Sequence, residues 1–222
     1  MNNSLKCKSL FSFNSNFIEN IFSAFEYPWE ILPSLRGIID GIIKNGLDGY
    51  WLLCDNVLVG EGVQIADSAH IDGPCIIGHG ATIRHGAYIR GSVILGDGAV
   101  VGNSSEVKNS IMMTKAQAPH FNYIGDSILG TRAHLGAGAI CSNLRSDGGN
   151  VKIKHMDEVI ETGMRKLGAI LADGVEIGCG SVLCPGTIVG KNTAIYPLTM
   201  ARGYYPQDSI IKNDGSVIPR TK

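Results

Sequence analysis

Apolar side chains recur at every sixth position through the middle of the chain. A small or aliphatic residue stands two positions before each of them, and glycines follow many. Alternating apolar positions that repeat every six residues predict short strands with one inward face, separated by tight turns. The first run comprises Val59, Ile65, Ile71, Ile77, Ile83, Ile89, Leu95, Val101, Val107 and Met113, and the second Leu171, Ile177, Leu183, Val189 and Ile195. The fold class predicted is mostly β, a parallel β-helix of hexapeptide repeats.

Three hexads would close one triangular coil of about 18 residues, so residues 18 apart should stack on successive coils. Adjacent coils then lie about 4.8 Å apart, the spacing of paired strands. Cys75 and Cys141 fall on inward positions and are expected in the core. The alternative fold, a sandwich of alternating strands, would show a period of two with hairpin turns.

The N-terminal flank follows a helical pattern. Apolar residues at helical spacing from Phe17 to Phe25 and from Leu35 to Ile43 predict two helices, and Asn45-Gly46 is a helix stop signal. Residues 1–50 are therefore expected to form a short helical segment that covers an open end of the β-helix.

The β-helix itself is predicted for residues 51–200. An insertion at about 145–166 leaves the six-residue pattern, and its VKIKH stretch alternates like one strand of an arm. A C-terminal tail, 201–222, follows, with a hairpin expected around Asp214-Gly215.

The composition narrows the classes of function. The 19 Lys and Arg against 20 Asp and Glu leave a formal charge of −1, which argues against binding nucleic acid. No run of 18 apolar residues predicts a membrane span, and the N-terminus lacks a signal-peptide pattern. The six cysteines form no CxxC pair, so free thiols in a reducing cytoplasm are expected.

One corner of the predicted β-helix gathers charged residues. Asp72, Arg90 and Lys108 are each 18 residues apart and should stack on successive coils. Arg90 and Lys108 would place two cations about one strand spacing apart with no carboxylate between them. Such a pair favours a bound anion, and Arg can hold phosphate with two N–H groups. A pair of solvated surface charges is the alternative.

The six-residue pattern is lost in KAQAPHFNYIGDS, Lys115 to Ser127. Pro119 fixes the backbone ahead of His120, and Tyr123 follows three positions later. A histidine in a segment that leaves a rigid scaffold is a candidate general base, because its reference pKa of about 6.5 suits proton transfer near neutral pH. The remaining histidines are expected to be solvated: His70, His79 and His85 in regular coils and His155 in the arm.

The run EVKNSIMMTKAQAPHFNYIGDSILGTRAHLGAGAICSNLR, Glu106 to Arg145, together with MRKLGA at 164–169, carries a family resemblance. It resembles the acetyltransferase domain of bifunctional glucosamine-1-phosphate N-acetyltransferase/uridylyltransferases, and is most similar to the archaeal sugar-1-phosphate nucleotidylyltransferase/acetyltransferases. The resemblance, from about Tyr27 to Pro197, implies a left-handed β-helix and a homotrimer with sites between its prisms. The nucleotidylyltransferase domain of that family is not expected here, because the residues before the repeat are too few to form it.

The resemblance also implies roles for individual residues. His120 matches the general base of the family, Tyr123 a tyrosine beside the sugar, and Arg90 and Lys108 the phosphate-binding pair. The further matches are Asn143 and Lys152 near the acceptor, His134 at an acceptor position, and the backbone around Ala137, Cys179 and Pro197 near the thioester and pantetheine arm of acetyl-CoA.

The sequence departs from the family at several of these positions. His134 stands where the family has Asn, Cys179 where Ser is usual, and Pro197 where Ala is usual. A second family lysine falls on Gly149. His134 and Gly149 therefore leave the identity of the acceptor sugar open.

Other classes of site are not favoured. The pairs Gly136/Gly138 and Gly178/Gly180 lack the strand-to-helix context of a dinucleotide site. The γ-class carbonic anhydrases share the predicted fold and bind zinc through three histidines, but no third histidine follows His85 and His120 at a suitable spacing. No metal site is predicted.

The leading hypothesis is a cytoplasmic, acetyl-CoA-dependent N-acetyltransferase acting on glucosamine-1-phosphate or a related amino-sugar phosphate, as in UDP-GlcNAc biosynthesis. No metal would be required for the acetyl transfer, and the partners expected are these two small molecules and two further copies of the chain. Two alternatives are an acyltransferase acting on another amino sugar or a nucleotide sugar, and a non-catalytic trimeric assembly or regulatory subunit.

Overall fold

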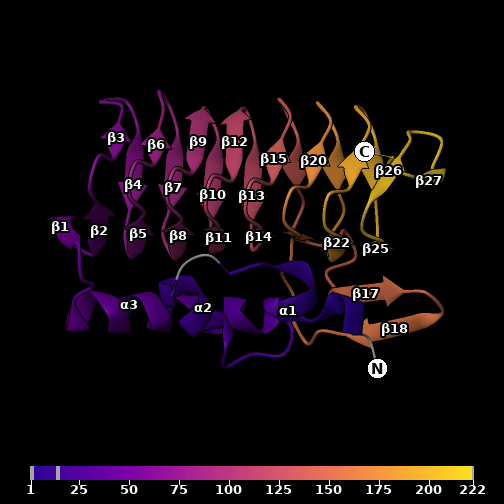
Figure 1. The fold of residues 1–222 in the computed structure, drawn as a ribbon, viewed down its shortest axis with the longest axis horizontal. Helices are drawn as coiled ribbons and strands as arrows, with labels where there is room; N and C mark the ends of the chain where they lie inside the picture. The colour runs from indigo at the N-terminus through magenta and orange to yellow at the C-terminus, as the bar shows by residue number, and fades with distance from the viewer. Residues whose placement is uncertain (1–2, 14–15, 222) are drawn as a thin grey trace.

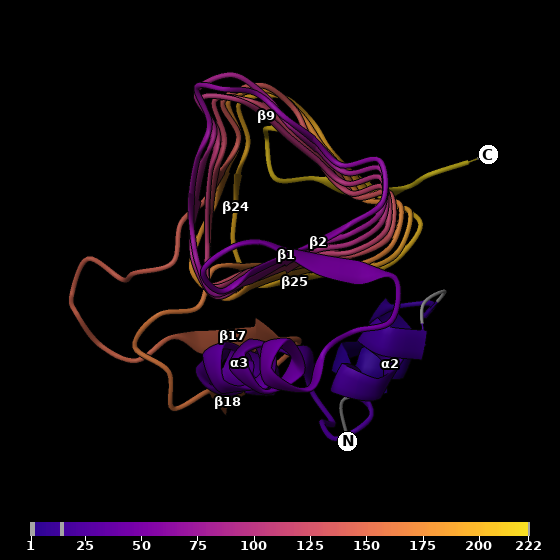
Figure 2. The same cartoon turned by 90° about the vertical axis from the view of Figure 1, so that its left-hand side faces the viewer.

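The computed structural model describes residues 3–13 and 16–221. Successive coils pair in parallel on three sheets and form a left-handed parallel β-helix, which Figure 2 shows end-on as a triangle. The mostly β fold and its repeat are confirmed. Among the described residues, no helix is long and apolar enough to cross a membrane.

The three sheets are named here A, B and C in the order in which each coil visits them. Sheet A contains β1 (Tyr50–Cys54), β2 (Val57–Gly60), β5 (Cys75–Ile77), β8 (Val93–Leu95), β11 (Ser110–Met112), β14 (Ile128–Leu129), β19 (Ala169–Leu171), β22 (Thr187–Val189) and β25 (Tyr204–Tyr205). Sheet B contains β3 (Gln64–Ile65), β6 (Thr82–Ile83), β9 (Val100–Asn103), β12 (Gln117–His120), β15 (His134–Leu135), β20 (Glu176–Ile177), β23 (Ala194–Ile195), β26 (Ser209–Ile211) and β27 (Val217–Pro219). Sheet C contains β4 (His70–Asp72), β7 (Tyr88–Arg90), β10 (Glu106–Lys108), β13 (Tyr123–Gly125), β16 (Ile140–Cys141), β21 (Val182–Leu183) and β24 (Met200–Ala201).

The inward side chains of the coils form the core, as the six-residue pattern predicts. Cys75 and Cys141 are fully buried there. Burial raises the pKa of both thiols to about 12, so neither is a reactive thiolate at neutral pH. Their predicted place in the core is confirmed.

The coil changes its length at one corner, between Lys108 and Ser110. Val93 pairs with Ser110, one residue short of the spacing that separates Cys75 from Val93. Asn109 turns the chain there in a left-handed conformation, with φ 46°. Met112, and not Met113, therefore lies opposite Leu95, so the strict period of six ends at Val107.

The stretch around His120 does not leave the β-helix, and this prediction from the sequence is wrong. Ala118 pairs with Val101 in sheet B, and Ile124 pairs with Val107 in sheet C. The repeat continues one residue out of phase. Small inward side chains such as Ala116 and Ala118 conceal the shifted pattern in the sequence.

The N-terminal segment contains η1 (Asn3–Leu5), α1 (Cys7–Leu10), α2 (Asn16–Phe22), η2 (Pro28–Ser34) and α3 (Leu35–Asn45). The helix end predicted at Asn45-Gly46 is confirmed, since α3 ends there and Gly46 has φ 78°. Figures 1 and 2 show α2 and α3 lying along the outside of sheet A, and α3 contacts β8. The expected position over an open end of the β-helix is therefore wrong.

Sheet A explains this position, because its outward side chains are also apolar. They are buried beneath the helices and the arm, and comprise Ile76, Ile94, Ile111, Ile128, Ile170 and Ile188. Burial of each aliphatic side chain contributes about 1.5–3 kcal/mol, so this face needs a cover. The triplets of consecutive apolar residues, such as CII and VIL, are the sequence signal of a strand buried on both sides.

The insertion forms a two-stranded antiparallel hairpin, β17 (Lys152–His155) and β18 (Glu158–Glu161), which is called the arm below. VKIKH thus contains a strand, as predicted. His155 was expected to be solvated, and this is wrong: it is 5% exposed, shares a 2.9 Å hydrogen bond with the Ser4 hydroxyl, and has its ring 4.7 Å from that of Tyr204. The arm is therefore tied to the N-terminal segment and to a late coil.

The ladder of the β-helix continues past residue 200. β22 pairs with β25 in sheet A, and β23 pairs with β26 in sheet B. The hairpin expected at Asp214-Gly215 is present: β26 pairs antiparallel with β27, and Gly215 has φ 84°. Most of the predicted tail therefore belongs to the coil and its closing hairpin.

Candidate active site

The corner where sheet C leads into sheet A, called the C–A corner, carries the predicted cation pair. Asp72 pairs in register with Arg90, and the β7–β10 pairing places Lys108 on the next coil. The predicted stacking is therefore present. The predicted absence of a carboxylate is wrong, because Arg90 lies 2.6 Å from Glu106 and Lys108 lies 3.6 Å from Asp126. The hydrogen bond from Arg90 to Glu106 raises the pKa of the guanidinium.

Asp126 is the centre of a cluster at this corner, and the sequence reasoning missed it. Asp126 is 4% exposed, and its carboxylate accepts hydrogen bonds from the Nδ2 atoms of Asn109, at 2.8 Å, and Asn143, at 2.5 Å. Nδ2 of Asn143 also lies 3.2 Å from the Tyr123 hydroxyl. Burial raises the pKa of Tyr123, so its hydroxyl keeps its proton near neutral pH. The structure thus brings Lys108, Tyr123 and Asn143 together around one carboxylate.

The opposite edge of sheet C, where sheet B leads into it, is called the B–C corner and holds His120. The carbonyl of His120 accepts the N–H of Gly138, that of Ala137 accepts the N–H of Gly180, and that of Cys179 accepts the N–H of Leu198. His120, Ala137, Cys179 and Pro197 therefore occupy the same turn on successive coils. The residue expected to act as base and the backbone expected near the thioester are therefore stacked in one column, meaning one turn position repeated on successive coils.

A buried amide fixes the backbone at His120. Oδ1 of Asn122 accepts the N–H of His120 at 3.1 Å, and its Nδ2 donates to the carbonyls of Gly136 and Ala139. Asn122 is 3% exposed and occupies an inward position, where apolar residues are usual. The His120 side chain is exposed, and it forms no side-chain hydrogen bond with another described residue. A polar residue at an inward position was the signal that the sequence reasoning passed over.

Two predicted site residues lie apart from these clusters. His134 lies on sheet B, with Nδ1 2.9 Å from the Glu176 carboxylate. Lys152 is on the arm, with Nζ 2.6 Å from Glu161. The described structure places neither of them in contact with the cluster around Asp126.

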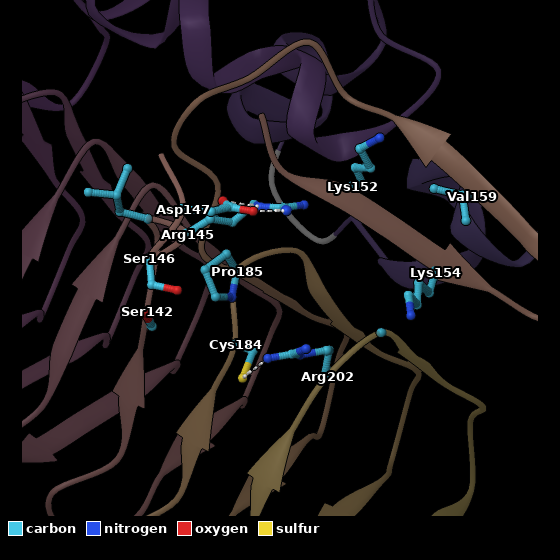
Figure 3. A pocket seen from close by; sticks show the side chains of 12 residues that line it. Ser142, Arg145, Ser146, Asp147, Lys152, Lys154, Val159, Cys184, Pro185 and Arg202 are labelled. Atoms are coloured by element: carbon cyan, nitrogen blue, oxygen red, sulfur yellow. Dashed lines mark hydrogen bonds and ion pairs between the residues drawn. The ribbon is translucent and has the colours of Figure 1, made fainter. Parts of the chain in front are cut away.

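A cavity of about 650 Å³ opens beneath the arm at the C–A corner. Figure 3 shows one wall formed by Lys152, Lys154 and Val159 of the arm, and the other sides formed by residues of the coils and of the segment that leads from β16 to the arm. The residues that line it are Ser142, Leu144, Arg145, Ser146, Asp147, Lys152, Lys154, Val159, Cys184, Pro185, Arg202 and Gly203. Among the described residues, no group of three or more His, Cys, Asp or Glu is arranged to hold a metal ion.

The parallel coils, their six-residue pattern and the polar side chains gathered at two edges of one sheet define a hexapeptide-repeat β-helix protein. Comparison with known families identifies the group within this class. The chain belongs to the family whose model is described as the GMPPB C-terminal domain, which matches residues 71–203.

Curated relatives agree with this assignment. A bifunctional protein GlmU of Methanococcus maripaludis is 36% identical over 200 residues, which cover 88% of this chain and 48% of the relative. A bifunctional sugar-1-phosphate nucleotidylyltransferase/acetyltransferase of Sulfurisphaera tokodaii is 36% identical over 87 residues, 39% of this chain and 22% of the relative. The chain thus spans about half, or less, of the length of these relatives.

Similar solved structures include a point mutant of AntD, an N-acyltransferase of Bacillus cereus, in complex with dTDP-4-amino-4,6-dideoxyglucose and coenzyme A. It has 16% sequence identity and a TM-score of 0.47, and the match covers 80% of this chain and 92% of that one.

Proposed function

We propose that the protein is an acetyl-CoA-dependent N-acetyltransferase that acts on glucosamine-1-phosphate or a related amino-sugar phosphate. The observation that supports this most is the B–C corner, where exposed His120 shares a column with Ala137, Cys179 and Pro197. The names of the bifunctional relatives support the reaction class.

In this proposal the His120 imidazole removes a proton from the amine of the acceptor as its nitrogen attacks the thioester carbonyl. The new N–C bond forms, the C–S bond breaks, and the proton passes to the leaving thiolate of coenzyme A. A backbone N–H at the glycine-rich turn around Ala137 stabilises the oxyanion of the tetrahedral intermediate. Asn122 holds the backbone of His120, which fixes where the base stands.

The phosphate of the acceptor is assigned to Arg90 and Lys108 at the C–A corner. Glu106 and Asp126 already orient these two cations, so the phosphate competes with the carboxylates and binds well only when it contacts both cations. Anchoring the phosphate holds the acceptor equally in the substrate complex and in the transition state, so its contribution is expected in the KM for the acceptor.

Arg90→Gln is expected to raise the KM for the amino-sugar phosphate by about 10- to 150-fold, because a hydrogen bond to a charged group contributes about 1.5–3 kcal/mol. The value of kcat should change little, since Arg90 does not touch the reacting nitrogen. Steady-state release of coenzyme A thiol measures both constants. Arg84→Gln, a change at an exposed arginine that directly follows β6, is the matched control. An unchanged KM in Arg90→Gln would contradict the assignment.

We also propose that the protein is a cytoplasmic homotrimer. Apolar side chains remain exposed on sheet C and at its B–C edge, with Ile140 37%, Leu198 78% and Met200 69% exposed. Packing of neighbouring β-helices against one another would bury these apolar side chains and remove them from water. Sedimentation equilibrium should give the mass of three chains, and Leu198→Asp should lower the mass toward one chain. A monomeric wild-type protein would contradict this proposal.

A further inference from the structure

The cavity beneath the arm continues the charged column of the C–A corner at its far end. Ser142 and Cys184 donate their N–H groups to the carbonyls of Leu183 and Ala201, which places Ser142, Cys184 and Arg202 at one turn on successive coils. Lys108 occupies the same turn earlier in the β-helix, because it pairs with Gly125. Arg202 lies four coils beyond Lys108, roughly 19 Å at the strand spacing. A single phosphate cannot contact both residues.

Two cations of the cavity lack a carboxylate partner. Arg145 pairs with Asp147, and Lys152 pairs with Glu161. Lys154 and Arg202 have no carboxylate within ion-pair distance among residues 3–13 and 16–221. The Arg202 guanidinium donates a long hydrogen bond to the Cys184 sulfur, at 3.9 Å. The lining therefore carries excess positive charge, which favours an anion.

The arm holds Lys154 in place over the cavity. Residues alternate along β17, so Ile153 and His155 are buried while Lys152 and Lys154 are exposed and line the cavity. The hydrogen bond of His155 with Ser4 and its ring contact with Tyr204 fix this strand. Lys154 is thus presented by a strand anchored on two sides and not by a free loop.

Apolar side chains complete the walls. Leu144 is 43% exposed and Val159 54% exposed, and Pro185 lies between Arg145 and Cys184 in Figure 3. Surfaces of this kind suit the faces of a planar heterocycle. The hydroxyls of Ser142 and Ser146 add hydrogen-bonding groups beside the cations. A volume of about 650 Å³ is within the range of small-molecule sites.

We propose that this cavity binds a nucleoside diphosphate group, with its phosphates on Lys154 and Arg202 and its base against Leu144, Val159 and Pro185. Two molecules of the proposed reaction class carry such a group: the acyl donor, through its adenosine diphosphate end, and a nucleotide-linked amino sugar as acceptor. The binding of a nucleoside diphosphate group does not depend on the proposed acetyl transfer. Only the choice between acyl donor and nucleotide-linked acceptor as the molecule that carries this group rests on that function.

Titration calorimetry of the full chain with ADP and with UDP tests the site. The wild-type protein should bind at least one probe saturably, and Lys154→Gln and Arg202→Gln should each raise its Kd about tenfold or more. Lys44→Gln, at an exposed lysine of α3, and Arg90→Gln, at the opposite end of the column, should bind as the wild type does. Circular dichroism verifies that every variant folds.

Three results would overturn the proposal: neither probe binds the wild-type protein saturably, both cavity variants bind as tightly as the wild type, or Arg90→Gln weakens binding as much as they do. Kinetics then identify the source. If the donor occupies the cavity, Arg202→Gln raises the KM for acetyl-CoA and leaves that for the sugar phosphate unchanged; if a nucleotide sugar does, only the KM for that acceptor rises. Because titration needs no turnover, failure of acetyl transfer leaves the binding result intact.

Discussion

His120→Ala is expected to lower the kcat of acetyl transfer by about 10²- to 10⁴-fold, the usual contribution of a positioned general base. The protonated amine of an amino sugar cannot attack a thioester, and His120 is the residue that the B–C corner offers to remove the proton. Neither KM should change much, because the phosphate contacts and the backbone of the corner stay in place. Stability should also be preserved, since the side chain is exposed.

Thiol release from acetyl-CoA with glucosamine-1-phosphate measures this effect. His85→Ala is the matched control: His85 is also exposed and lies at the B–C corner two coils before His120, on the side away from Ala137, Cys179 and Pro197, where its Nδ1 shares a 2.6 Å hydrogen bond with the Ser68 hydroxyl. A His120→Ala rate close to that of the wild type would remove the histidine from the mechanism. If the wild-type protein transfers no acetyl group to any amino-sugar phosphate, other amino sugar or nucleotide-linked amino sugar, the non-catalytic assembly role is favoured instead.

The fold was largely predictable because an inward-facing apolar residue recurs at every sixth position of the sequence. Where that position is filled by Ile, Leu or Val, the prediction is confirmed to the residue, as at Ile77 opposite Val59 and Leu95. It failed where small or polar residues replace them. Ala118 and Asn122 hid a one-residue shortening of the coil, and the regular segment around His120 was interpreted as an interruption.

The N-terminal segment and the arm were predicted as elements but not in their positions. Local apolar patterns predict the helices, whereas the position of the helices depends on which sheet has an apolar outer face to bury. The outward isoleucines give sheet A such a face, and they are visible in the sequence as apolar triplets. The burial of His155 was not predictable, because its partners Ser4 and Tyr204 lie far away in the chain.

The candidate site was predictable as far as residues stack at the repeat distance. The 18-residue spacing in the sequence predicts that Arg90 stacks beside Lys108, and the strand pairing confirms it. The repeat distance could not show that Glu106 pairs with Arg90 and that Asp126 pairs with Lys108. Glu106 lies beside the stacked position and not on it, and Asp126 lies on the next coil, which is one residue shorter. Roles carried by family resemblance alone, such as those of His134 and Lys152, stay predictions.

Asp126→Ala is expected to lower the free energy of unfolding by about 3–5 kcal/mol, because two hydrogen bonds to a buried charged acceptor are lost, each contributing about 1.5–3 kcal/mol. The amides of Asn109 and Asn143 would lose their acceptor, and Lys108 would lose its carboxylate. Alanine is also strained at the φ of 49° found here. The KM for the amino-sugar phosphate should rise as well, because Lys108 and Asn143 are no longer held.

Two variants separate these causes. Asp126→Asn keeps the shape and one acceptor oxygen, and asparagine tolerates a left-handed backbone, so the expected loss is below about 2 kcal/mol. Asp208→Ala is the matched control, because Asp208 has φ 53° and also accepts a hydrogen bond from an asparagine, Asn192, but pairs with no cation among the described residues. Its loss should be about 1–2 kcal/mol, from strain and one exposed hydrogen bond. Urea unfolding followed by circular dichroism gives all three values. If Asp126→Ala costs no more than Asp208→Ala, the carboxylate does not hold the C–A corner together, and the phosphate site must be organised by Arg90 and Lys108 alone.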